Sequence, residues 1–254
     1  MAIDLTLMEV AKSDGVGLLR VYGWSNPTIS FGRNERVVGV YEARELTAAG
    51  LEFVRRPTGG RALLHSREVT YSVAMPLSDQ SRWPVAYEAV NQRLLAAMQA
   101  LGVPALIARA SAQLAEVTDH AVASNSPSHD QHVVCFSGIA PGEIAVGDRK
   151  LVASSVWRDR AAYLQHGSIL IHDDQSTLRG LLGARVAPLE PGATLSRFMP
   201  RLSDEAIVNR AEIALINAFG HCGKTVRWSI PKEVREQVDV TRSALSNSAW
   251  LWRR

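Results

Sequence analysis

The run from Arg55 to His65 (Arg-Arg-Pro-Thr-Gly-Gly-Arg-Ala-Leu-Leu-His) combines basic side chains with a pair of glycines. Adjacent glycines between apparent strands allow backbone conformations, and a close approach to a ligand, that residues with a Cβ resist. Arginine guanidiniums could bind a phosphate or a carboxylate with their forked donors. A tight hairpin with solvated arginines explains the run equally well, and the Gly-Lys-Ser/Thr ending of a P-loop is missing. The arginines and glycines concerned are Arg55, Arg56, Gly59, Gly60 and Arg61.

Cys135 is the second candidate, as a nucleophile. It lies between two valines and Phe136, and a lone cysteine in such a setting is more often a small buried hydrophobe. Lys150 would favour the nucleophile over the buried hydrophobe if its strand lies near Cys135, because an ammonium within a few ångströms favours thiolate over thiol. Cys222, which follows His221 past the end of a helix, has no comparable neighbour, and we expect no role for it.

His166, followed by Gly167 and Ser168, is the third candidate. A histidine beside a glycine at the start of a strand could bind substrate or act as a general base. A hydrogen-bonded histidine at a sheet margin is an equally good interpretation. The chain has no Gly-x-Ser-x-Gly run and no His-x-x-x-His pair, so we expect neither a serine hydrolase nor a metal site.

The composition of the 254-residue chain is globular, with 46% hydrophobic and 21% charged residues. A net charge of +3 and a pI near 9.1 favour an acidic partner but are too small to indicate nucleic acid. Two distant cysteines argue against a disulfide framework. No apolar run is long enough to span a bilayer, and the first residues do not resemble a signal peptide, so we expect a cytoplasmic protein without membrane contact.

The predicted elements are runs of strands flanked by helices that do not alternate with them, which indicates the α+β class. Residues 109–131 are poor in large apolar side chains, and we expect a mobile loop there, placed as a lid over the site. Helices are expected at 3–12, 41–49, 85–101, 175–182 and 204–219. Strands are expected at 18–24, 28–31, 51–55, 62–65, 69–74, 143–146, 150–155, 162–165 and 168–171, of which 143–155 form a hairpin.

Ordered motifs over residues 2–172 resemble the lipoate-protein ligase, octanoyltransferase and biotin-ligase superfamily. The similarity is greatest to the cysteine-dependent octanoyltransferases of bacteria, and no single block is specific without the others. The motifs are Trp24 to Arg33, Val54 to His65, Glu68 to Val73, Cys135-Phe136, Glu143-Ile144, Lys150 and Leu164 to Ile169.

The resemblance implies a mixed β-sheet packed by α-helices, as a biotin/lipoate ligase-like catalytic domain over 2–185. A helical extension over 186–254 would pack on the same domain. It also implies that the acyl chain lies in a tunnel beside the Arg-Pro-Thr-Gly-Gly-Arg loop. Besides the arginines and glycines of that loop, the implied substrate-binding residues are His65, Ser154, His166 and Gly167.

The implied reaction is a two-step acyl transfer. Cys135 attacks the thioester of octanoyl-acyl carrier protein, and a lysine of a lipoyl domain or of the glycine-cleavage H protein then takes the octanoyl group. Lys150 matches the family lysine that lowers the pKa of the cysteine and positions the thioester carbonyl. Transfer from a thioester to an amide runs downhill, so no cofactor is required. Both carriers are acidic, in agreement with the pI near 9.1.

Two positions depart from the family pattern. After its lysine the family has a Gly-Ser-Ala-Gln run, whereas here Ala153 stands at the glycine and Val156 at the amide side chain, which could change chain-length specificity or activity.

Two other functions stay open. An ATP-dependent lipoate-protein ligase would use ATP and Mg, with Lys150 and the Gly59-Gly60 loop holding a lipoyl-adenylate. Arg61 argues against it, because ligases carry a third glycine at this position. A non-catalytic acyl- or carrier-binding relative is the other alternative. A biotin ligase is not expected, since its Gly-Arg-Gly-Arg-x-Gly-Arg run is missing.

Overall fold

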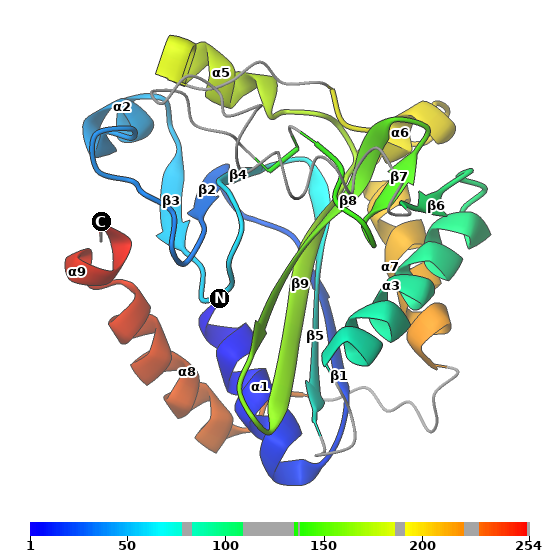
Figure 1. Cartoon of the computed structure of the whole chain (residues 1–254), viewed down its shortest axis with the longest axis horizontal. Helices are drawn as coiled ribbons and strands as arrows, with labels where there is room; N and C mark the ends of the chain where they lie inside the picture. The colour runs from blue at the N-terminus through cyan, green and yellow to red at the C-terminus, as the bar shows by residue number, and fades with distance from the viewer. Residues whose placement is uncertain (78–82, 109–134, 137, 186–190, 221–228, 253–254) are drawn as a thin grey trace.

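The computed structural model describes residues 1–77, 83–108, 135–136, 138–185, 191–220 and 229–252 (Figure 1). Their elements form two β-sheets with helices on the outer faces, which confirms the α+β class and the mixed strand pairing. The predicted loop 109–131 lies outside these residues, and so does Cys222.

The larger sheet has six strands in the order β1-β5-β9-β8-β7-β6, and every neighbouring pair is antiparallel. The expected hairpin at 143–155 is present as β7 and β8, joined at Gly147-Asp148. The strands predicted separately at 162–165 and 168–171 are one strand, β9. The bounds are β1 Leu18–Tyr22, β5 Glu68–Pro76, β6 Leu106–Ile107, β7 Ile144–Val146, β8 Arg149–Arg158 and β9 Ala162–Leu170.

β9 runs past His166 without a break because the next residue, Gly167, has no side chain. A Cβ at Gly167 would lie 2.2 Å from the Ala153 carbonyl oxygen and 2.8 Å from a ring carbon of Tyr71. Only glycine therefore allows β8 and β9 to approach this closely while Tyr71 packs beneath them.

The smaller sheet places β2 between β3 and β4. Its bounds are β2 Thr28–Phe31, β3 Glu52–Arg55 and β4 Leu63–His65. β2 runs parallel to β3 and antiparallel to β4, so β3 and β4 do not pair with each other. The glycine run between them is therefore a connection across β2, and the tight-hairpin interpretation of residues 56–62 is wrong. The strands expected at 18–24 and 28–31 belong to different sheets.

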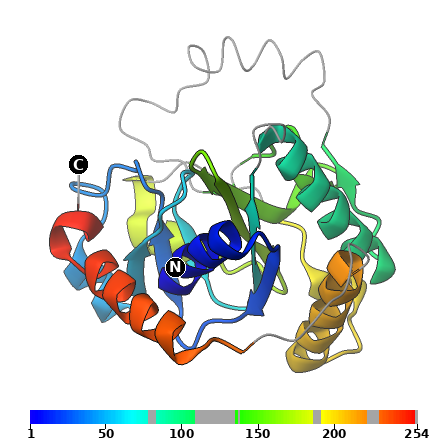
Figure 2. The same ribbon diagram turned by 90° about the horizontal axis from the view of Figure 1, so that it is seen from below.

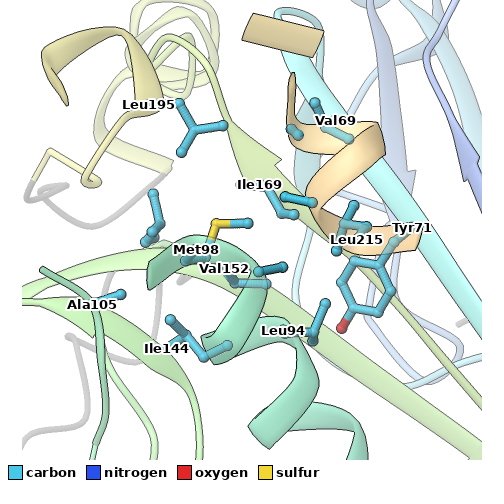
Figure 3. Packing of buried hydrophobic residues seen from close by; sticks show 14 of the residues in the cluster. Val69, Tyr71, Leu94, Met98, Ala105, Ile144, Val152, Ile169, Leu195 and Leu215 are labelled. Carbon is cyan, nitrogen blue, oxygen red and sulfur yellow. The ribbon is translucent and has the colours of Figure 1, made fainter. Parts of the chain in front are cut away.

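Two long helices, α3 (Trp83–Ala100) and α7 (Asp204–Gly220), cover one face of the larger sheet (Figure 1). Leu94 and Met98 of α3 and Leu215 of α7 are fully buried against the sheet side chains Tyr71 and Val152 (Figure 3). The apolar face of each helix follows the 3.6-residue period, which is why both helices were predictable. This layer is the main hydrophobic core.

α1 (Ala2–Asp14) packs on the opposite face of β5 and β9, beside the smaller sheet (Figure 2). It ends at Gly15, whose φ of 69° is the left-handed conformation that closes many helices. Leu7 and Met8 bury their side chains against Leu164. The remaining helices are α2 Ala43–Ala48, α5 Ser176–Leu182, the 3-10 turn Gly183–Arg185 and α6 Leu195–Phe198.

The C-terminal helices α8 (Lys232–Leu245) and α9 (Ser248–Leu251) contact α1 and β3 respectively. The Trp250 indole nitrogen donates to the Arg55 carbonyl oxygen at 3.0 Å, and Arg55 Nε donates to the Leu251 carbonyl oxygen at 3.1 Å. Trp252 packs edge-on against Phe53. The predicted division of the chain at residue 185 stays a prediction. Within the described residues, no helix is both long and apolar enough to cross a membrane.

Replacing Leu94 with alanine tests the main core. Leu94 is fully buried, so the deletion removes apolar contacts and leaves a cavity, and we expect the free energy of unfolding to fall by about 2 to 5 kcal/mol. Urea unfolding followed by circular dichroism measures it. The matched control is Val85→Ala on the same helix, where the side chain is 61% exposed, with an expected change within about 0.5 kcal/mol. Equal losses for the two variants would contradict this assignment of the core.

Candidate active site

A cavity lies between the two sheets and holds about 390 Å³ of empty space, counted out to its open mouth. The larger sheet contributes Tyr22, Thr70, Ala153, Ser154, Ser155, His166, Gly167 and Ser168. The smaller sheet and its connections contribute Ser30, Arg56, Gly60, Leu63 and His65, and Met1 and Cys135 complete the lining.

The loop after β3 forms one wall of the cavity around Arg56, which is 4% exposed. Its guanidinium donates to the carbonyl oxygens of Ser30, Gly59 and Arg61. Gly60 has a φ of 87°, and a Cβ there would lie 2.8 Å from the Arg56 guanidinium. Both facts require glycine at this position. The Arg56 guanidinium has no carboxylate within ion-pair distance among the described residues.

Three predicted binding residues of this loop do not line the cavity: Arg55, Gly59 and Arg61. Arg55 is fully buried, and it donates to the carbonyl oxygens of Gly32 and Glu35 at 2.6 and 2.9 Å. Its guanidinium links β3 to the turn after β2. Arg55 is therefore not the solvated arginine of the hairpin interpretation, and it does not reach this cavity as the predicted ligand contact would require. The Gly59 carbonyl accepts from Arg56 and from Ser155, and the Arg61 side chain is exposed.

Cys135 lines the cavity and packs against the apolar cluster of Leu63, Phe136, Ala153 and Leu170. Its backbone N–H donates to the Ala62 carbonyl oxygen at 2.9 Å, which fixes the nucleophile candidate to the end of the glycine loop. Lys150, on β8, donates from Nζ to the Cys135 carbonyl oxygen at 2.9 Å. The structure therefore brings Cys135 and Lys150 together, as the sequence motifs suggested.

Glu143 is a member of this site that the search for chemical candidates missed. Its carboxylate lies 2.8 Å from Lys150 Nζ and accepts from the Ala140 N–H at 2.7 Å, with both charged side chains almost fully buried. The predicted hairpin already indicated that Glu143 lies near Lys150. Glu143 immediately precedes β7, and β7 pairs with β8, which carries Lys150. The two hydrogen bonds hold the ammonium in one place.

The pKa of the Cys135 thiol is raised, mainly because burial disfavours the thiolate. The positive charges of Lys150 and Arg56 act in the opposite direction, while Glu143 and Glu35 add to the increase. The predicted effect of Lys150 on the thiol is thus present, but the burial of the sulfur outweighs it.

His166 lies inside β9 and lines the cavity. Its Nε2 is 2.6 Å from Thr58 Oγ1, and its Nδ1 is 3.6 Å from the Asp4 carboxylate. Burial lowers the pKa of His166, with Asp4 opposing the shift, so the ring is neutral near pH 7. Nε2 is therefore paired, whereas Nδ1 is buried without a hydrogen-bond partner among the described residues.

The other polar side chains of the lining also have hydrogen-bond partners within the protein. His65 bonds to Glu68 and Ser30, each at 2.7 Å, and Ser168 donates to Glu68 at 2.8 Å. The remaining pairs are Thr70 with Glu68, Tyr22 with Asp4, Ser154 with Tyr71, and Ser155 with the Gly59 carbonyl. A wall in which most polar groups are already paired offers mainly carbon to a ligand, which suits an apolar chain.

The two family departures lie on different faces of β8. Ala153 lines the cavity and packs beside Cys135. Val156 packs against the main core on the side of α3, because alternate residues of a strand face opposite ways. The expectation that Val156 removes a substrate contact is therefore wrong for this cavity. Among the described residues, no group of three or more His, Cys, Asp or Glu side chains is arranged to hold a metal ion.

Several curated relatives of this chain are octanoyltransferases. Octanoyltransferase LipM of Kyrpidia tusciae is 37% identical over 72% of this chain and 65% of its own length. LipM of Anoxybacillus flavithermus is 35% identical over 71% of this chain and 64% of its own length. These alignments span slightly less than two thirds of the relatives. LipM of Exiguobacterium sp. is 29% identical over all of this chain and 93% of its own length.

Solved structures show the same fold at lower identity. A lipoate-protein ligase A bound with ATP has a TM-score of 0.75 at 18% identity, over 99% of this chain and 92% of that one. A bipartite lipoate protein ligase of Thermoplasma acidophilum has a TM-score of 0.69 at 16% identity, over 99% and 89%. The lipoyl protein ligase A/B catalytic domain matches residues 1–225. The chain therefore belongs to the lipoyl protein ligase A/B catalytic-domain family.

Proposed function

We propose that this protein is a cysteine-dependent acyltransferase of lipoate biosynthesis. It takes an octanoyl group from octanoyl-acyl carrier protein and delivers it to a lysine of a lipoyl domain or of the glycine-cleavage H protein. The observation that carries the proposal is Cys135, which lines a cavity with mostly paired polar groups and whose carbonyl accepts from the buried Lys150. The relatives named octanoyltransferase LipM support it, and so does the T. acidophilum ligase, which was solved together with its E2 lipoyl domain.

In the first step, the Cys135 thiolate attacks the thioester carbonyl. A carbon–sulfur bond forms to Cys135, and the bond to the carrier's sulfur breaks, so that the carrier leaves as a thiol once it takes up a proton. Lys150 has three N–H bonds, of which one faces Glu143 and one the Cys135 carbonyl. We propose that the third donates to the oxyanion that develops on the thioester oxygen.

In the second step, the neutral amine of the acceptor lysine attacks the thioester on Cys135. An amide bond forms, the bond to Cys135 breaks, and the departing thiolate receives the proton that the amine nitrogen loses. The raised pKa of the thiol supports this exchange, because a thiolate in a buried site takes up a proton readily. Neither step consumes ATP, so we propose that the reaction needs neither ATP nor Mg. A free thiol nucleophile also suits the reducing conditions of the cytoplasm.

Charge variants test the coupling between the thiol and its neighbours. Because only the thiolate is alkylated and burial raises the pKa, we expect the iodoacetamide rate to rise with pH above the usual thiol value of about 8.5. Lys150→Met removes a positive charge, so its profile moves to higher pH by on the order of one unit. Glu143→Gln removes a negative charge, so its profile moves to lower pH. The thiol is uncoupled from the pair if both variants keep the wild-type profile.

Intact-protein mass spectrometry tests the transfer itself. The protein is mixed with octanoyl-acyl carrier protein in the absence of ATP, and we expect a single octanoyl adduct that hydroxylamine releases. Cys135→Ser, which keeps the size of the side chain, should form no such thioester and lose at least about a thousandfold in transfer to a lipoyl domain.

Two other outcomes would replace the proposal. Acceptor modification that requires free acid and ATP, and that Cys135→Ser retains, would identify a lipoate-protein ligase. Binding of acyl carrier without an adduct or a modified acceptor would identify a non-catalytic relative.

A further inference from the structure

Four residues of the larger sheet form a straight row along the floor of the cavity. Tyr22 on β1 is paired with Thr70 on β5, Thr70 with Ser168 on β9, and Ser168 with Ala153 on β8. Residues that are directly opposite each other in neighbouring strands lie on the same face of a sheet. All four line the cavity, so one row of its floor runs across the strands, beside a second part along β8 and β9.

The two ends of this row differ in character. At one end Ala153 belongs to the apolar cluster against which Cys135 packs, and both residues line the cavity. At the other end Tyr22 stands on β1, the outermost strand of the sheet, beyond which no further strand is paired among the described residues. A chain attached to Cys135 and lying along the row would therefore extend toward Tyr22.

The length of the row can be compared with that of an acyl chain. Three strand-to-strand spacings of about 4.8 Å give about 14 Å from β8 to β1. Contact with the side chain at the end takes about 4 Å of this, which leaves about 10 Å. Eight bonds join a cysteine sulfur to the last carbon of an octanoyl group, and at about 1.2 Å per bond in an extended chain they also span about 10 Å.

Tyr22 is held firmly in its place at the end of the row. The Arg20 guanidinium carbon lies 3.6 Å from the ring centroid, and the phenol oxygen donates to the buried Asp4 carboxylate at 3.3 Å. Trp24 stands beside it with the ring centroids 6.2 Å apart. Trp24 is itself fixed, since its indole nitrogen donates to Thr70 at 2.9 Å and its ring stacks on His65. Such a wall resists displacement by a longer chain.

We propose that Tyr22 is a specificity-determining residue that limits the acyl chain on Cys135 to about eight carbons. The inference rests on the proposed function, since it assigns the direction of the chain bound to Cys135. It concerns chain length alone and leaves the chemistry at Cys135 and Lys150 unchanged.

The test compares acyl-acyl carrier proteins with even-numbered chains from four to fourteen carbons, with the adduct on Cys135 measured by mass spectrometry. Tyr22→Ala removes the phenol ring, so the preferred chain should become about two to four carbons longer, with the twelve-to-eight-carbon rate ratio rising about tenfold. Tyr22→Phe keeps the ring and should keep the wild-type preference. Val21→Ala is the matched control, because Val21 is the neighbouring residue and packs into the main core on the other face.

A second readout separates the inference from the proposed function. Free fatty acids of the same lengths are tested for protection of Cys135 against alkylation, which needs no acyl transfer. If the wild type forms no adduct with any donor, the proposed function fails, and the protection series then decides the role of Tyr22. The inference is overturned if Tyr22→Ala keeps the wild-type length preference in the adduct series, or, where no adducts form, in the protection series.

Discussion

The pairing of the cavity's polar side chains among themselves is the constraint on which the site depends. Glu68, buried in β5, accepts from Ser168 and Thr70 and pairs with His65, so three polar residues of the lining turn their heteroatoms toward one carboxylate. A carboxylate buried without such partners would cost several kcal/mol, so the cluster is needed for folding. Its consequence for function is that a cavity built largely from polar residues presents carbon to a ligand. Because the hydrogen bonds to Glu68 turn these polar atoms away from the cavity, we propose that the cavity favours apolar acyl chains.

The charged groups around Cys135 act on the pKa of its thiol in opposite directions. Lys150 and Arg56 bring positive charge to the sulfur, Glu143 and Glu35 bring negative charge, and burial raises the pKa of the thiol. In the proposed second step, the raised pKa lets the departing sulfur take up the proton that the attacking amine loses. A balanced set of charges therefore suits a sulfur that must attack in one step and depart in the next. An unopposed lysine would serve the attack alone.

The sequence predicts those parts of the structure that local pattern determines. The helical periodicity of α3 and α7 and the Gly147-Asp148 turn of the hairpin are local, and their elements are confirmed. Spacing could not show that β3 and β4 flank β2, and the glycine run was therefore equally compatible with a hairpin. The carbonyl contacts of Arg55 reach from residue 32 to residue 251, so its structural role is a property of the tertiary fold. The row from Ala153 to Tyr22 depends on the register of four strands.

In the proposed function, catalysis and chain selection lie at opposite ends of one row of residues. Lys150 belongs to β8, and its ammonium donates to the Cys135 carbonyl. Tyr22 lies on β1, an outer strand that contributes no group to the reacting atoms. A change of side chain at the outer strand alters the space available to the end of the acyl chain and leaves the ion pair of Lys150 and Glu143 in place. Members of one family can therefore share a reaction centre and differ in acyl length, because the residues that set the two properties are separated by the width of the sheet.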